Sequence, residues 1–111
     1  MIAVPTMYGQ KIIDVDDILF IKADGSYSVI HSTSDSIMVS KNLKSIDLAL
    51  THSNLIRVHR SYIVNVNKVT ELHRDGGGYL LLDQDNLSIP LGDQRKRIVV
   101  EYLKSIFNFV K

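Results

Sequence analysis

Short apolar runs that contain β-branched residues dominate the first two-thirds of the chain, and polar segments separate them. This pattern is typical of β-strands joined by turns. It predicts strands at residues 10–13, 18–23, 27–31, 37–39, 55–58, 62–66, 69–73, 79–82 and 87–91. Pro90 limits the last run to a sheet edge or a strand end, because proline cannot donate a ladder hydrogen bond. The pattern therefore predicts a mainly β domain.

Two other segments place apolar residues three or four positions apart, which is the spacing of an amphipathic helix. The first predicts a short helix over about residues 41–51, with Ser40 as its N-cap. The second predicts a C-terminal helix over about residues 93–108, with Asp93 as its N-cap. Basic residues at 95–97 crowd the start of that helix, where the helix dipole disfavours cations. Such a local departure is typical of a functional site.

Length and composition narrow the class of protein. The 111 residues suffice for one domain with an ordinary core, and the hydrophobic and charged fractions of 45% and 23% exclude disordered and fibrous classes. The chain has no cysteine, which excludes disulfides and thiolate sites. It shows no apolar run of about 18 residues and no signal-peptide pattern. We therefore expect a cytoplasmic domain with no membrane partner.

The net charge of +1 is distributed unevenly. Residues 1–50 carry four basic and six acidic side chains, whereas residues 51–111 carry nine basic and six acidic ones. A protein that binds a polyanion needs a basic face rather than a basic total. The second half can supply such a face.

The sequence gives no support for an enzyme. His59 and Ser61 stand two positions apart, with no carboxylate nearby to orient the imidazole, so we expect His59 to be structural or a phosphate donor. The histidines lack metal-ligand spacing, and residues 83–86 open like a calcium loop but lack its later glycine and glutamate. The glycines at 76–78 lack the Lys-Ser/Thr of a phosphate loop. We expect no catalytic residue, no metal and no cofactor.

The most distinctive segment is LIRVHRSYIVN, residues 55–65. On a strand, Arg57, His59 and Ser61 would share one face. Its arginines, histidine, serine and asparagine carry donors that suit phosphate oxygens and base edges. The alternative is a charged edge strand that keeps the domain soluble, and composition alone favours that alternative.

Together with three other segments, this one forms a set of four motifs that follow one another along the chain. They are DILFIKADGSY at 17–27, SKNLK at 40–44, LIRVHRSYIVN at 55–65, and a glycine-rich hairpin from 77 that continues into IPLGDQRK at 89–96. Together they resemble the LytTR DNA-binding domain family of bacterial transcription regulators. The resemblance covers about residues 10–107.

The resemblance implies an elongated, mostly antiparallel LytTR-type β fold of about ten short strands, with the two helices. It implies a domain over residues 10–108 that follows an N-terminal extension at 1–9. Loops of that fold would enter the major groove. The implied function is sequence-specific binding of double-stranded DNA, as a transcriptional regulator or as the output domain of a two-component response regulator.

The resemblance also implies which residues touch DNA. They lie in the first turn, at the end of the central strand, and at the starts of the two helices: Asp24, Gly25, Ser26, Tyr27, Lys41, Asn42, Lys44, Arg57, His59, Arg60, Ser61, Asp93, Gln94, Arg95 and Lys96. Arg60 is expected to reach N7 and O6 of guanine, and Arg95 and Lys96 to neutralise phosphates.

Two positions depart from the family's pattern. Gly92-Asp93 stands where the family usually has Ser-Arg, and that arginine would contact a base. Asp93 cannot read guanine and phosphate repels it, although it can accept a hydrogen bond from the cytosine amino group. Arg95 is the residue expected to replace the missing arginine. Lys22 stands where the family prefers an acidic residue, which adds positive charge near the first contact turn.

The implied partners are direct repeats of double-stranded DNA and a second copy of the chain bound beside the first. Regulators of this family commonly place a receiver domain or a sensor before the DNA-binding domain. The chain is therefore expected to be a stand-alone regulator or part of a longer one. The alternative interpretation is a protein-interaction module of the same fold that has lost DNA recognition, and Asp93 and the near-neutral net charge support it.

Overall fold

The computed structural model describes residues 1–50, 54–83 and 87–110. This part of the chain contains ten strands, two α-helices and three short 3-10 helices. In chain order they are β1 (Ile2–Thr6), β2 (Gly9–Ile13), η1 (Val15–Asp17), β3 (Ile18–Asp24), β4 (Tyr27–Ser32), β5 (Ser36–Val39), α1 (Leu43–Ala49), β6 (Leu55–His59), β7 (Tyr62–Asn65), η2 (Val66–Lys68), β8 (Val69–His73), η3 (Asp75–Gly77), β9 (Tyr79–Leu82), β10 (Ser88–Pro90) and α2 (Lys96–Ile106). The expected mainly β class is confirmed.

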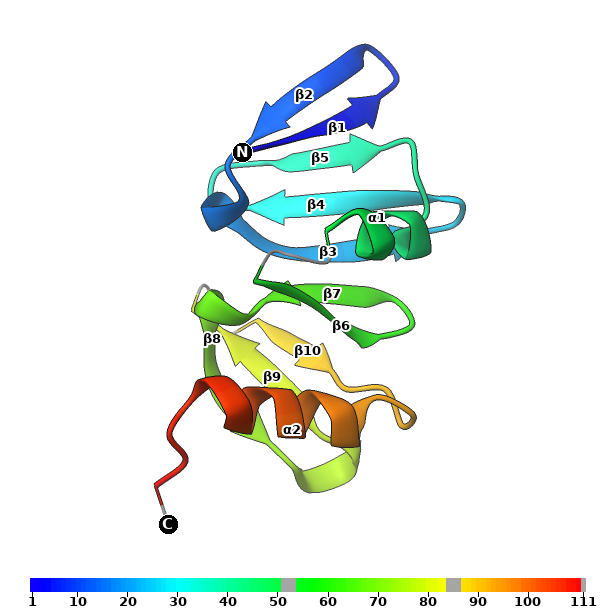
Figure 1. Ribbon diagram of the computed structural model, residues 1–111. Helices are drawn as coiled ribbons and strands as arrows, with labels where there is room; N and C mark the ends of the chain where they lie inside the picture. The colour runs from blue at the N-terminus through cyan, green and yellow to red at the C-terminus, as the bar shows by residue number, and fades with distance from the viewer. Residues whose placement is uncertain (51–53, 84–86, 111) are drawn as a thin grey trace.

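The strands form three antiparallel sheets that follow one another along the long axis of the molecule (Figure 1). The hairpin β1-β2 lies at one end, the five-stranded sheet β5-β4-β3-β7-β6 lies in the middle, and the three-stranded sheet β10-β9-β8 lies at the other end. The molecule measures 48 × 26 × 24 Å, as expected for an elongated fold. Pro90 ends β10, an edge strand, as predicted.

Two hydrophobic clusters hold the sheets together. The first joins the β1-β2 hairpin and α1 to the five-stranded sheet through buried side chains such as Val4, Ile13, Ile21, Ile30, Leu43 and Ile46. The second joins that sheet to β9, β10 and α2 through Phe20, Val58, Val64, Leu80, Ile89, Val99 and Leu103. Because β3 contributes to both clusters, the central sheet fixes the two ends of the molecule relative to each other.

The strand that the sequence pattern missed is β1. Its buried face consists of little more than Val4, and Pro5 interrupts the run, so the apolar signal is weak. β1 nevertheless pairs with β2 in full register, from Ile2 opposite Ile13 to Thr6 opposite Gly9. Residues 2–6, which the sequence placed in an extension, are therefore paired and packed against the rest of the domain.

Both helices begin later than predicted. Asn42, and not Ser40, caps α1, because its Oδ1 accepts a hydrogen bond from the Ser45 amide at 2.9 Å. α2 begins at Lys96, and Asp93 is not its cap. The Gly92 carbonyl accepts hydrogen bonds from the amides of Arg95 and Lys96, so residues 93–95 form a turn before the helix.

Position 51, the predicted end of the first helix, and positions 84–86 of the predicted turn lie outside the described residues. Neither helix in the described part of the chain combines the length and the apolar character that a membrane span requires.

Asn65 has a structural role that the sequence did not reveal. Its side chain is 1% exposed, and its Nδ2 donates hydrogen bonds to the Ile18 carbonyl at 2.9 Å and to the Val15 carbonyl at 3.4 Å. Its Oδ1 accepts from the Asn67 amide at 3.0 Å. The sequence pattern places this asparagine among possible DNA donors, but its side chain is buried between β7 and the start of β3.

Replacing Asn65 with alanine should therefore lower the free energy of unfolding by about 3 kcal/mol, because it leaves buried carbonyl and amide groups without partners. Urea denaturation measures this change. Asn67→Ala is the matched control, since the Asn67 side chain is exposed, and it should stay within about 0.5 kcal/mol of the parent chain. Equal losses in the two variants would contradict the role given to Asn65.

Candidate nucleic-acid interface

Four loops open on the same long side of the molecule, which is the right side of Figure 1. They are the β3–β4 turn at 25–26, the β5–α1 loop at 40–42, the β6–β7 turn at 60–61 and the β10–α2 loop at 91–95. We call this side the loop edge. The three regions expected to touch DNA thus lie next to one another, although they come from distant parts of the sequence.

Hydrogen bonds of 2.9 Å join neighbouring loops of the loop edge. The bonds are Ser28 Oγ to the Lys41 carbonyl, the Ala23 amide to the Ser61 carbonyl, and the Gly92 amide to the Val58 carbonyl. Each joins a residue of one loop to a strand residue close to the neighbouring loop, so the loops hold one another in place. A surface fixed in this way needs little ordering when a ligand binds.

The β3–β4 turn is narrow and projects from the sheet. Gly25 adopts φ 60°, a left-handed conformation that costs other residues about 1–2 kcal/mol. A Cβ on Gly25 would meet no atom within 4 Å, so the backbone conformation, and not crowding, requires glycine here. Asp24 and Tyr27 pair across the turn, and the Tyr27 side chain is 52% exposed.

The β6–β7 turn departs from regular strand geometry. The register between β6 and β7 shifts between Arg57 and His59, so the simple alternation predicted for 57–61 is wrong. Arg57 folds back onto the turn: its Nε donates to the His59 carbonyl at 2.9 Å and its terminal nitrogen donates to the Arg60 carbonyl at 2.6 Å. Burial and the nearby Arg95 lower the pKa of Arg57. Arg57 therefore braces the turn that carries Arg60.

His59 is held in a defined orientation in the same turn. Its Nδ1 accepts a hydrogen bond from the Ser61 amide at 3.0 Å, which requires Nδ1 to be unprotonated. The neutral ring therefore carries its proton on Nε2. Burial, followed by the charges of Arg60, Arg57 and Arg95, lowers the pKa of His59 and so favours this neutral form.

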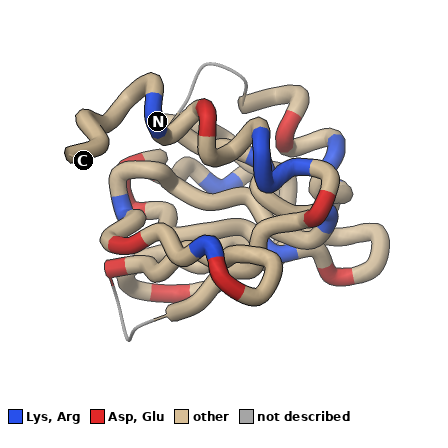
Figure 2. Tube along the Cα trace, turned by 90° about the horizontal axis from the view of Figure 1, so that it is seen from below, with Lys and Arg blue, Asp and Glu red and all other residues tan. Residues whose placement is uncertain are grey.

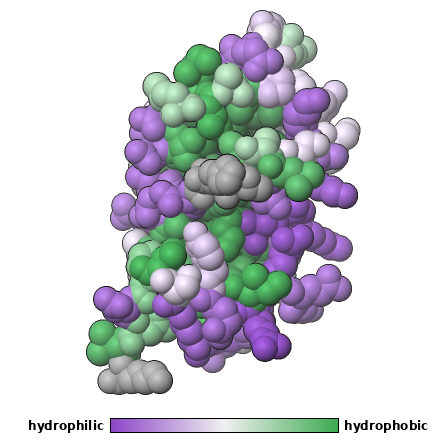
Figure 3. Space-filling view, in the orientation of Figure 1, coloured by the Kyte–Doolittle hydropathy of each residue, from purple (hydrophilic) through white to green (hydrophobic). Residues whose placement is uncertain are grey.

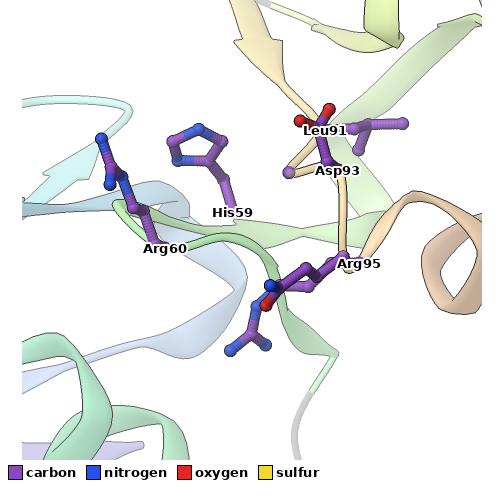
Figure 4. A pocket seen from close by; sticks show the side chains of 7 residues that line it. His59, Arg60, Leu91, Asp93 and Arg95 are labelled. Carbon is purple, nitrogen blue, oxygen red and sulfur yellow. The ribbon is translucent and has the colours of Figure 1, made fainter.

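A pocket of about 520 Å³ separates the β6–β7 turn from the β10–α2 loop. Its lining residues are His59, Arg60, Leu91, Gly92, Asp93, Gln94 and Arg95. Figure 4 shows His59 between Arg60 and Asp93, with the Arg95 side chain extending to the other side of the loop. Candidate residues from two contact regions thus meet in one concave site that contains both basic and acidic groups.

The charge on the loop edge is mixed but mainly basic. Figure 2 shows most Lys and Arg segments in the right half of the view, with Asp and Glu segments between them. Figure 3 shows hydrophilic side chains along the right side of the molecule from its middle downward. Lys41, Lys44 and Arg60 are exposed, and Arg95 is half-buried.

Two further expected contact residues, besides Arg57, make hydrogen bonds within the protein. The Lys96 ammonium donates to the Arg74 carbonyl at 2.9 Å and so ties the β8–β9 connection to the start of α2. The Asn42 side-chain oxygen is occupied by the cap of α1. The Lys96 bond was not evident from the sequence, because its partners are 22 positions apart and no local pattern marks them. The Asn42 cap spans only three positions, at the exposed start of α1.

The described residues hold no group of three or more His, Cys, Asp or Glu side chains arranged to bind a metal ion. His73 contacts Glu71 at 2.9 Å and stacks on Tyr79 with ring centroids 4.6 Å apart. That pair lies on the three-stranded sheet, where Tyr79 is opposite Pro90, the last residue of β10 before the β10–α2 loop.

Comparisons with known proteins give the chain a family. The LytTr DNA-binding domain family matches residues 8–104. A response regulatory protein of Vibrio cholerae is 29% identical over 89 residues, which are 75% of this chain and 34% of that protein. The CO-responsive transcriptional regulator RcoM of Rhodospirillum rubrum is 31% identical over 83 residues, which are 72% of this chain and 35% of that protein.

A solved structure agrees with the fold. The LytTr DNA-binding domain from a Bacillus cereus protein superposes with a TM-score of 0.74 at 18% identity, over 97% of this chain and 96% of that one. The chain spans only about a third of the length of the two regulators described above. The family match covers nearly all of the chain, and the sheets, helices and loops agree with it. The chain belongs to the LytTr DNA-binding domain family.

Proposed function

We propose that the loop edge binds double-stranded DNA in a sequence-specific way and that the chain serves transcriptional regulation. The observation that carries this proposal is the row of loops joined by hydrogen bonds, which presents narrow turns and basic side chains on one side of an elongated domain. Small turns can enter a major groove about 12 Å wide, much as a helix does in other regulators. The family to which the chain belongs supports the same function.

Affinity would come mainly from phosphate contacts. Lys41, Arg60 and Arg95 lie on loops of the loop edge, and Lys44 lies in the first turn of α1. All four carry charges that phosphate oxygens attract. Four such contacts correspond to a slope of log affinity against log salt of about −3.6. Arg57 and Lys96 add to the positive electrostatic potential, but their side chains are hydrogen-bonded to backbone carbonyls. Their main effect is therefore on loop geometry.

Specificity would come from the pocket between the two lower loops. Arg60 can bond N7 and O6 of guanine, and Gln94 can bond N6 and N7 of adenine. Asp93 would be repelled by phosphate but can accept from the amino group of cytosine. Among the described residues, the Nε2–H of His59 has no hydrogen-bond acceptor, so it can donate to a base edge or a phosphate.

The assembly on DNA is part of the proposal. A single module buries only about 600–1,000 Å² of protein surface, which favours two copies on direct repeats. Since the matched relatives are about three times as long as the aligned region, we infer that the chain works with a receiver or sensor segment. A bacterial regulator of this kind would act in the cytoplasm.

Replacing Arg60 with alanine should weaken binding to a duplex selected by the parent protein by about 1–3 kcal/mol, and binding to random DNA by much less. Fluorescence anisotropy at several salt concentrations measures both. Lys104→Ala is the matched control, because it removes the same charge from the far end of α2, where Lys104 pairs with Glu101 at 3.7 Å. It should bind both duplexes like the parent.

Each other outcome of that experiment has a definite meaning. Equal losses on selected and random DNA would reduce Arg60 to a phosphate contact. Parent binding without any salt dependence would contradict DNA binding and favour the protein-interaction module. A loss in Lys104→Ala would place the DNA elsewhere on the surface.

The folding stability of the domain should depend on pH through His59, which lies beside the turn that carries Arg60. Because the folded pKa of His59 is lowered, the unfolded chain takes up protons first as the pH falls below about 6.5, and folding stability falls with it. Burial and the charge of Lys22 also lower the pKa of His31, so His31 adds to the same loss of stability. Urea denaturation at pH 7.5 and 5.5 should show a smaller difference for His59→Asn, whose Oδ1 can replace Nδ1 as acceptor. An unchanged difference would contradict this role.

The pairing of two copies predicts a dependence on helical phase. The free domain should sediment as a monomer, and a duplex with two direct repeats one or two helical turns apart should bind a second copy cooperatively. Adding about five base pairs between the repeats turns them to opposite sides of the duplex and should remove the cooperativity. Equal cooperativity at both spacings would contradict binding to one face.

A further inference from the structure

The β1–β2 turn, residues 6–9, opens on the same side of the molecule as the four loops of the loop edge (Figure 1). It carries two apolar side chains with almost no protein contact: Met7 is 82% exposed and Tyr8 is 93% exposed. The two neighbouring side chains form a small exposed patch at the tip of the turn, and exposed patches of this kind can be binding sites. Figure 3 shows green and pale atoms over this turn, at the top right of the molecule.

The turn is fixed and not a loose terminus. Thr6 Oγ1 accepts from the Tyr8 amide and donates to the Gly9 carbonyl, both at 3.2 Å. Gly9 adopts φ 130°, which closes the turn. The hairpin is anchored behind it by buried Val4 and Ile13. Met7 and Tyr8 are therefore presented in a set direction.

The hairpin is also tied to the loop edge itself. The Ser40 amide donates to the Pro5 carbonyl at 2.9 Å, which links the end of β1 to the β5–α1 loop. On the opposite strand, Lys11 pairs with Asp35 at 3.7 Å. A shallow pocket of about 420 Å³ connects Tyr8 with Tyr27 of the β3–β4 turn and with Met38. The β1–β2 turn thus lies next to the four loops of the loop edge and extends their row.

We propose that this turn is a further DNA contact, with Met7 and Tyr8 lying against the sugar-phosphate backbone of the duplex beside the segment that the other loops read. The proposal rests on the function proposed above. The molecule is 48 Å long in the direction in which the loops follow one another, whereas one turn of duplex spans about 34–36 Å. A duplex that follows the loop edge over the full length of the molecule, for more than one helical turn, therefore also passes the hairpin.

The chemistry of the hairpin fits this occupant. Residues 2–13 contain one charged side chain, Lys11, and no carboxylate that would repel phosphate. The Tyr8 hydroxyl can donate to a phosphate oxygen, and its ring and the Met7 side chain can cover the apolar faces of the sugars. Such contacts carry no base information, so the turn would add affinity and footprint length and leave the sequence preference unchanged.

The test uses the whole chain and a duplex selected by it from a random pool. Tyr8→Ala should bind that duplex about fivefold more weakly, near the lower end of what an aromatic contact with nucleic acid contributes. The loss should disappear when the duplex is trimmed from the end that lies under the hairpin. Ile12→Ala is the matched control, because Ile12 is 62% exposed on the same hairpin but away from its turn, and it should bind like the parent.

The outcomes separate this inference from the proposed function. If Tyr8→Ala binds the long duplex like the parent while Arg60→Ala is impaired, the loop edge binds DNA and the hairpin inference is wrong. A loss that is equal on long and trimmed duplexes also contradicts it. If the free parent chain is a dimer and Tyr8→Ala is a monomer, the turn joins two copies and does not contact DNA. If the parent chain binds no duplex, both proposals fail.

Discussion

The hydrogen bonds between neighbouring loops are the constraint on which the rest of the structure depends. The four loops come from two sheets, and loops are ordinarily the most mobile part of a fold. Here the Ala23 amide donates to the Ser61 carbonyl and the Gly92 amide donates to the Val58 carbonyl, so two turns and the segment before α2 are joined into one surface. Because β3 lies in both hydrophobic clusters, that surface also spans the two halves of the domain.

The basic residues divide into two kinds that composition cannot separate. Arg57 forks onto two carbonyls of its own turn, and Lys96 reaches the Arg74 carbonyl across 22 positions. These two side chains set the shape of the loops. Arg60, in contrast, projects beside the pocket next to His59 (Figure 4). A brace and an exposed arginine three positions apart in one segment explain why residues 57–61 are so polar although part of the segment faces the protein.

Much of the fold followed from the apolar pattern, because most strands bury one face and the two helices bury a stripe. β1 was missed because Pro5 interrupts it and its pairing partner, not its own composition, makes it a strand. The helix starts were placed too early, since Ser40 and Asp93 are plausible caps and only the chain path selects Asn42 and the turn at 93–95. The family was confirmed by comparison, whereas the contact residues stay predictions, and the roles of Arg57 and Asn65 required three-dimensional contacts.

The central claim, that DNA lies along the row of loops, is tested most directly by following backbone amide signals of the isotopically labelled chain in nuclear magnetic resonance spectra during titration with duplex DNA. We predict that the largest shifts occur at Gly25, Lys41, Ser61 and Gly92, which all lie on loops of that row. Asp35, in the β4–β5 turn at the other ends of the strands, should shift little. Shifts that centre on Asp35, or on the stacked pair Phe20 and His31, would contradict the account.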